Sequence, residues 1–149
     1  MLKKLVDLLE VFEGFKEQVY LCSAGKKTIG IGTLWFEGMP TKVTHAEAVK
    51  LCEKDCVKFI AAVDKVVKVP LNENQKIALV SFVYNLGPAA LASSTLLKKL
   101  NKGGYKEAAE EFVKWNKARV NGGALVEVKG LTTRRKAEKE LFLESTKGN

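Results

Sequence analysis

A short amphipathic segment that ends beside a glycine, followed at once by two β-prone runs, constrains this chain more than any other feature. The segment closes at Glu13, and Gly14 lets the backbone leave a helix there. The β-prone runs cover 19–21 and 28–32, with a turn over 23–26 between them. This order predicts a helix that leads directly into a β-hairpin.

The predicted hairpin gathers three side chains that can do chemistry. Cys22 and Thr28 lie on either side of the turn, so they come close across the ladder and can face the end of the helix that carries Glu13. A carboxylic acid, a side chain capable of acting as a nucleophile and a hydroxyl around one cleft indicate hydrolysis by general acid catalysis.

A long helix is expected after the hairpin. Thr44 and Glu47 have the spacing of a capping box, in which each side chain binds the other residue's backbone N–H. The apolar residues that follow, up to Val67, recur every three or four positions and form one stripe. Pro70 ends the helix, which is long enough to connect an N-terminal lobe to the rest of the chain.

The remaining sequence predicts a helical bundle. Asn72 and Gln75 repeat the capping pattern before an apolar run over 77–84, which is typical of a buried helix, and Gly87 stops it before Pro88. The other expected elements are a helix capped by Ser93 or Ser94 through Leu100, a helix from Tyr105 to Trp115, a loop from Asn121 to Gly130, and a last helix capped by Thr132 or Thr133.

These elements predict an α+β fold in a single domain over 1–149. We expect a small N-terminal β-hairpin lobe over about 13–60 and a mostly helical C-terminal lobe over about 61–149. The N-terminal helix is assigned to the second lobe, the long helix joins the two, and a cleft is expected between them.

Composition limits the class of protein. Lys and Arg number 25 against 17 Asp and Glu, a net charge of +8 that favours encounters with polyanions or serves general solubility. The lysines form no basic tail. No run of 18 apolar residues occurs, and Asp7 and Glu10 interrupt the first apolar stretch, so we expect no membrane anchor, no signal peptide and synthesis in the cytoplasm.

The three cysteines, Cys22, Cys52 and Cys56, are expected to be reduced. Cys52 and Cys56 share a helix face and are interpreted as core thiols. With one histidine in the chain, His45, no zinc ligand set is apparent, and His45 itself is expected to be an exposed helix-start residue.

The hairpin region resembles the phage lysozymes (endolysins) of glycoside hydrolase family 24. That family has Glu, then Asp nine residues later, then Thr six residues after that, opening Thr-Ile-Gly-x-Gly. Glu13, Cys22 and Thr28 keep this spacing, with Cys in place of Asp. The segments 75–87, 94–101 and 130–138 resemble the family's central helix, the segment after it and its C-terminal signature.

The resemblance implies catalytic roles for Glu13, Cys22 and Thr28. Glu13 is the general acid, and apolar neighbours such as Phe12 and Phe15 favour its protonated form. Thr28 holds the attacking water. Cys22 acts as a thiolate that replaces the carboxylate, as a nucleophile toward the sugar, or as a small residue that the hairpin merely tolerates.

A second set of residues is expected to bind substrate: Gly32, Leu34, Asn85, Ser94, Thr95, Arg134 and Arg135. Amides and hydroxyls suit the N-acetyl and hydroxyl groups of a sugar chain, and arginines suit cell-wall anions. Arg134 has a second interpretation, in which it pairs with a carboxylate and fixes the last helix.

The resemblance therefore implies a monomeric endolysin, a muramidase that hydrolyses the β-1,4 bond between N-acetylmuramic acid and N-acetylglucosamine in peptidoglycan. It implies no cofactor, no metal and no nucleic acid, and access from the host cytoplasm to the cell wall or periplasm through a holin pore. Two alternatives stay open: a lytic transglycosylase, and a basic, non-enzymatic envelope-binding protein.

Overall fold

The computed structural model describes residues 1–119 and 122–144. It divides into two compact units, Met1–Lys58 and Phe59–Asn149. The boundary falls inside α2 (His45–Val66), near the expected limit of the first lobe. The N-terminal helix groups with the first unit and not with the second, because it continues straight into the sheet and packs its end against it. The expected fold class is confirmed: a small β-sheet lobe and a mostly helical remainder.

The first unit opens with α1 (Leu2–Glu13), which buries Leu5, Val6 and Leu9 on one face. The helix ends as predicted, because Gly14 takes a positive φ of 74° and donates its N–H to the carbonyl oxygen of Glu10 at 2.8 Å.

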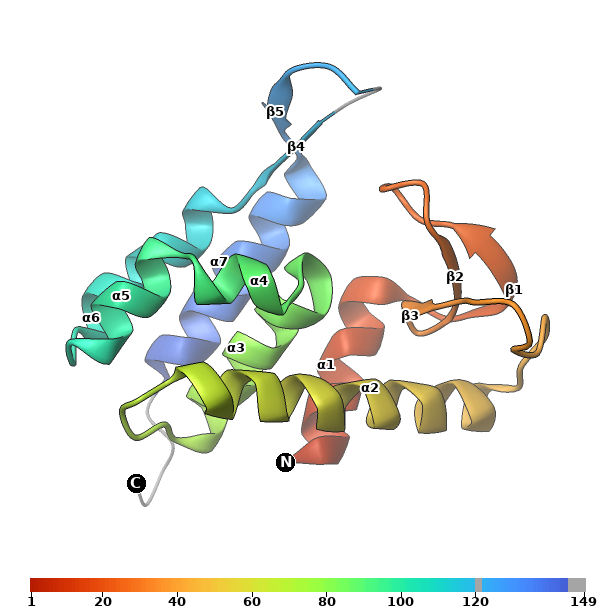
Figure 1. The fold of residues 1–149 in the computed structure, drawn as a ribbon, viewed down its shortest axis with the longest axis horizontal. Coiled ribbons are helices and arrows are strands. Elements are labelled where there is room, and N and C mark those ends of the chain that lie inside the picture. The colour runs from red at the N-terminus through yellow and green to blue at the C-terminus, as the bar shows by residue number, and fades with distance from the viewer. Residues whose placement is uncertain (120–121, 145–149) are drawn as a thin grey trace. The chain divides into compact units, whose positions relative to one another are not determined.

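A three-stranded antiparallel sheet follows, with strand order β1-β2-β3 (Figure 1). Its strands are β1 (Lys16–Leu21), β2 (Lys27–Gly30) and β3 (Thr33–Leu34). The single strand predicted over 28–32 is therefore divided. Gly30 and Gly32 have φ values of 67° and 72°, and this left-handed backbone turns the chain into β3.

The capping box of α2 is confirmed. Thr44 Oγ1 accepts the backbone N–H of Glu47 at 3.1 Å, and Glu47 Oε1 accepts the N–H of Thr44 at 2.8 Å. Cys52 and Cys56 are fully buried reduced thiols, as expected of core residues.

The second unit is built around α3 (Glu73–Leu86), in which every residue over 77–83 is buried. Asn72 and Gln75 form the predicted capping box at its start, and Gly87, at φ 90°, ends it. Pro88 prevents α3 from continuing, and it also occupies the first turn of a new short helix, α4 (Pro88–Ala92).

Aromatic side chains fill the core of this unit. The ring of Phe82 lies 5.6 Å from that of Phe112 and 5.5 Å from that of Trp115, both edge-on. Ser94 caps α5 (Thr95–Asn101), as expected. The helix predicted over 105–115 is too long, since α6 (Tyr105–Glu111) tightens into the 3₁₀ turn η1 (Phe112–Lys114), which places Phe112 inward.

The loop predicted from Asn121 to Gly130 is wrong in the part that is described, and Asn121 itself lies outside the described residues. A hairpin of β4 (Lys117–Arg119) and β5 (Leu125–Glu127) precedes α7 (Lys129–Leu143), as Figure 1 shows. Neither Thr132 nor Thr133 caps α7, which begins after Val128 without a side-chain cap. The Thr132 hydroxyl instead accepts the side-chain amide N–H of Asn116 at 3.0 Å.

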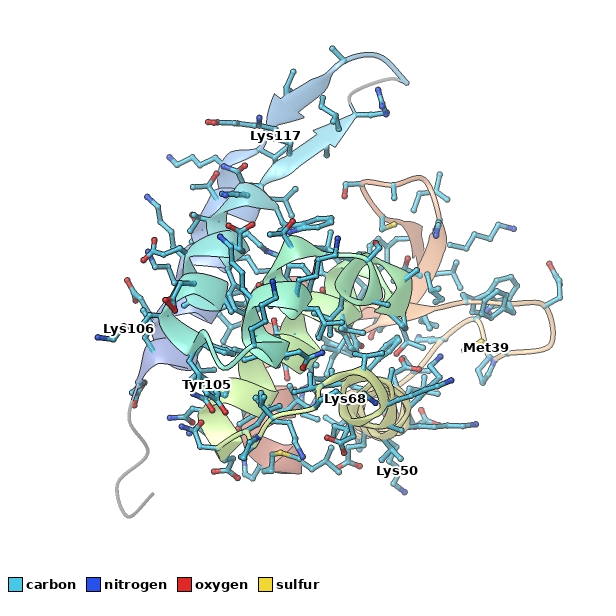
Figure 2. The ribbon with its side chains drawn as sticks, turned by 60° about the vertical axis from the view of Figure 1, so that its left-hand side comes forward. Met39, Lys50, Lys68, Tyr105, Lys106 and Lys117 are labelled. Atoms are coloured by element: carbon cyan, nitrogen blue, oxygen red, sulfur yellow. The ribbon has the colours of Figure 1, made fainter. Side chains whose placement is uncertain are left out.

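Lysines are spread over the surface of each unit. Figure 2 shows Lys50 extending away from α2, and Lys106 and Lys117 away from the second unit, all exposed. No described helix is long and apolar enough to cross a membrane.

Two glycines give a matched test of the first unit's packing. A methyl group at Gly30 would stand 3.0 Å from Ala48 Cβ, whereas one at Gly25 would meet open space, although both have positive φ. Gly25→Ala should lower the free energy of unfolding by about 1–2 kcal/mol from backbone strain alone. Gly30→Ala should cost about 1–3 kcal/mol more from overpacking. Urea unfolding of both variants measures the difference, and equal losses would contradict this packing.

Candidate active site

Glu13 is the last residue of α1, and its side chain lies against the backbone of Gly32 in the turn between β2 and β3. A methyl group at Gly32 would stand 2.8 Å from Glu13 Oε1 and 2.9 Å from Glu13 Cδ. The absence of a side chain at Gly32 therefore makes room for the carboxyl group, which is half-buried. This contact links the predicted acid to the predicted glycine of the Thr-Ile-Gly-x-Gly pattern.

Cys22 and Thr28 meet at the turn between β1 and β2, as predicted. The Cys22 N–H donates to the carbonyl oxygen of Lys26 at 2.9 Å, and the Gly25 N–H donates to the carbonyl oxygen of Cys22 at 2.8 Å. Thr28 is 3% exposed, and its hydroxyl donates to the same Lys26 oxygen at 2.9 Å. The Thr28 hydroxyl also lies within hydrogen-bonding reach of the Cys22 side chain.

The turn favours a negative charge on sulfur. Partial burial raises the pKa of the Cys22 thiol, but hydrogen bonds from the backbone N–H groups of Lys26 and Ala24 and from the Thr28 hydroxyl lower it by more. The net pKa of Cys22 lies below its ordinary value. A larger fraction of Cys22 is therefore thiolate near neutral pH than in a free cysteine.

Tyr20 lies beside the predicted site residues, and it was not among those predicted from the sequence. It pairs with Thr28 across the ladder, so the two side chains share one face of the sheet. Burial raises the pKa of the Tyr20 phenol, and the negative charges of Glu13 and Cys22 raise it further. Its phenol thus lies within electrostatic reach of both groups. Side chains alternate between the two faces of a strand, so residues 20 and 22 share a face. This alternation could have identified Tyr20 from the sequence.

Leu34 completes this face. Thr28 pairs with Leu34 on β3, which places Tyr20, Thr28 and Leu34 in one row across the three strands. The Leu34 side chain is 44% exposed, whereas its cross-strand neighbour Thr28 is buried. The first unit therefore brings together five predicted residues with Tyr20: Glu13, Cys22, Thr28, Gly32 and Leu34.

The remaining predicted residues lie in the second unit, and their surroundings differ. Thr95, at the start of α5, is exposed. Ser94 is buried. Its hydroxyl donates to the Leu91 carbonyl oxygen at 2.7 Å and accepts the Leu97 N–H at 3.0 Å, so its hydrogen bonds are already made within the protein. Asn85, near the end of α3, is exposed and accepts a hydrogen bond from Arg135.

Arg134 and Arg135 are buried in α7, at 6% and 0% exposure, and both form ion pairs with Glu138. Direct contact with a wall polymer does not fit such burial. The geometry favours the second interpretation for Arg134, in which it pairs with a carboxylate and fixes the last helix.

His45 lies at the start of α2, where it was expected, with its side chain 56% exposed. Its Nε2 is 2.9 Å from Glu10 Oε1, and its ring meets that of Phe15 edge-on at 5.2 Å. It joins the helix start to α1. Among the described residues no cluster of three His, Cys, Asp or Glu side chains could hold a metal ion.

The turn geometry predicts the reactivity of the three thiols. Iodoacetamide should modify Cys22 first, because Cys52 and Cys56 are buried. Thr28→Val removes a hydrogen bond that stabilises the thiolate, so the pKa of Cys22 should rise and the pH midpoint of its alkylation should move upward. Mass spectrometry of alkylation rates against pH measures both effects. An unchanged midpoint in Thr28→Val would contradict the assigned hydrogen bond.

The phage lysozyme family matches the chain over residues 10–138. The endolysin of Acyrthosiphon pisum secondary endosymbiont phage 1 is 41% identical over 140 residues, covering 94% of this chain and 95% of the relative. Some relatives are longer, and the chain spans 54% of the endolysin of Bacillus phage B103.

Solved structures agree with this assignment. The endolysin from Escherichia coli O157:H7 phage FAHEc1 superposes with a TM-score of 0.87 at 38% identity, over 99% of this chain and 95% of that one. The muramidase domain of SpmX from Asticaccaulis excentricus gives 0.87 at 34% identity, over 96% of this chain and 97% of that one. From its sequence motifs, its fold and these relatives, the chain belongs to the phage lysozyme family.

Proposed function

We propose that this protein is an endolysin with muramidase activity, which hydrolyses the β-1,4 bond between N-acetylmuramic acid and N-acetylglucosamine in peptidoglycan. The observation that carries the proposal is the contact of Glu13 with Gly32 in the same small sheet in which Cys22 and Thr28 meet at one turn. Family membership and the likeness to a muramidase domain support the substrate class.

Glu13 acts as the general acid in this proposal. Cleavage of a glycoside requires a proton on the leaving oxygen as the bond from that oxygen to the anomeric carbon breaks. Glu13 is half-buried against Gly32 at a helix end, where its position is restricted. Its carboxyl group delivers the proton, and the sugar develops positive charge at the anomeric carbon.

Cys22 and Thr28 act together on that charge. The thiolate stabilises the developing cation, and the two side chains hold the water that adds to the anomeric carbon. As its oxygen bonds to that carbon, the water passes one proton to the thiolate, and exchange with solvent then returns a proton to Glu13 and restores the thiolate. The low thiol pKa supports this assignment over a spectator role. Direct attack by sulfur is less suitable, because a soft nucleophile matches an oxocarbenium-like carbon poorly. The Thr28 hydroxyl, which already contacts Cys22, favours hydrolysis over the transglycosylase reaction, which needs no water.

Leu34, Gly32, Asn85 and Thr95 are proposed to contact the glycan. Leu34, Asn85 and Thr95 are exposed, and Gly32 lies beside the acid. Ser94, Arg134 and Arg135 are proposed to act indirectly, by fixing the helices that carry exposed residues.

We also propose that the enzyme acts as a monomer and reaches the wall from the host cytoplasm through a holin, as its family membership suggests. Bacterial cultures that express this protein together with a holin should lyse, and cultures that express it without a holin should not. Lysis at equal rates in both would contradict the holin requirement.

Replacing the acid tests the central assignment. Glu13→Gln keeps the size of the side chain and removes the transferable proton, so clearing of peptidoglycan should fall by roughly a thousandfold. Circular dichroism should match that of the parent. Glu10→Gln is the control on the same helix and should keep activity. A folded Glu13→Gln protein that clears peptidoglycan at a rate within tenfold of the parent's would contradict the assignment of Glu13 as the acid.

Substitutions at residue 22 test whether the charge matters. Cys22→Asp supplies a carboxylate, so the protein should stay active and become resistant to iodoacetamide. Cys22→Ser carries no charge near neutral pH and should lose about a hundredfold in clearing rate. If Cys22→Ser matches the parent, and confirmed alkylation of Cys22 changes nothing, the residue is a spectator.

A further inference from the structure

A buried ionic cluster joins α3 to α7 in the second unit, and the proposed mechanism does not use it. Glu138 is fully buried, and its Oε1 forms an ion pair with Arg135 Nε at 3.1 Å. Its Oε2 accepts hydrogen bonds from Arg134 Nε at 3.3 Å and from Ser81 Oγ at 2.5 Å. Arg134 also donates to the Ser81 carbonyl oxygen at 3.0 Å. Burying three charges is costly, and each member of the cluster holds the others in place.

The cluster reaches the surface through Asn85. The guanidinium of Arg135 is fixed by Glu138 and by the ring of Phe82, whose centroid lies 5.3 Å from Arg135 Cζ. From this position Arg135 donates a hydrogen bond of 2.6 Å to Asn85 Oδ1.

This contact decides how the Asn85 amide is oriented. A guanidinium carries donors and no acceptor, so the amide atom that faces Arg135 must be the oxygen. The Asn85 NH₂ group then points away from Arg135, and among the described residues no side-chain hydrogen bond occupies it. Asn85 is exposed, so the two N–H donors of its amide face solvent, while its amide oxygen faces Arg135.

We infer that Asn85 is a substrate-selecting residue whose NH₂ group donates to carbonyl oxygens of peptidoglycan, and that Arg135 and Glu138 are positioning residues that fix its orientation. The ligand class is an acylated glycan, with the carbonyl supplied by an acetamido group or by a stem peptide. The inference rests on the proposed function for its substrate class, but it concerns binding and not the chemical step.

The key variant is Asn85→Asp, which separates the two roles of the residue. An aspartate keeps an oxygen for Arg135 and adds an ion pair, so the melting temperature should equal or exceed that of the parent. It replaces the outward donors by an acceptor, so ligand binding should weaken about tenfold. Asn85→Ala loses both contacts and should lower the melting temperature as well.

Binding should be measured in the Glu13→Gln background, as sedimentation with insoluble peptidoglycan at high ionic strength. Glu13→Gln prevents degradation of the ligand. Asn72→Asp is the charge control in the same unit, because it keeps the acceptor that binds the Gln75 N–H at 2.8 Å, and it should bind within twofold of the parent.

Tenfold weaker binding by Asn85→Asp, with an undiminished melting temperature, supports the inference. Binding within twofold of the parent overturns it. A loss of binding that accompanies the same drop in melting temperature as Asn85→Ala also overturns it, because the role is then structural. If Asn85→Asp behaves as expected but the parent releases no sugar from peptidoglycan, the proposed function fails while the binding role stands.

Two modified ligands identify the carbonyl. De-N-acetylated peptidoglycan lacks the acetamido carbonyl, and glycan strands stripped of stem peptides lack the peptide carbonyls. The difference between the parent and Asn85→Asp should vanish on one of them, which names the source. An equal difference on both ligands would contradict recognition of a carbonyl.

Discussion

The contact between the Glu13 carboxyl group and the Gly32 backbone is the constraint on which the first unit depends. It requires that α1 end at Glu13 and that the chain turn at Gly14. It also requires a glycine with positive φ, Gly32, after β2, at the position that the Glu13 side chain contacts. The same turn sets the register that pairs Thr28 with Leu34, and the turn between Cys22 and Lys26 sets the register that pairs Thr28 with Tyr20. The proposed acid and the proposed water-binding face therefore depend on two consecutive turns of the same sheet.

The second unit depends on a different kind of interaction, the buried charge of Glu138. Burial raises the pKa of this carboxyl, and the guanidinium groups of Arg135 and Arg134 counter the effect. Such a cluster is a weak source of net stability, but each member specifies the place of the others. It connects the position of α7 to the orientation of Asn85 on α3, which a core of apolar side chains alone would not determine.

The sequence predicted those features whose cause is local. Thr44 with Glu47 and Asn72 with Gln75 mark helix starts because each pair binds its own backbone, and Gly14 and Gly87 mark ends because of their positive φ. The start of α7 was missed because Val128 supplies no side-chain cap. The burial of Arg135 was missed because it depends on Phe82 and Asn85, some fifty residues away, although Glu138 three positions on was a usable signal.

Digestion of purified peptidoglycan in oxygen-18 water, followed by mass spectrometry of the released fragments, tests the account most directly. Acid catalysis by Glu13 with water held by Cys22 and Thr28 predicts one labelled oxygen on each new reducing end, at N-acetylmuramic acid, and none elsewhere. Anhydro ends without label, or new reducing ends at N-acetylglucosamine, would contradict the proposed reaction.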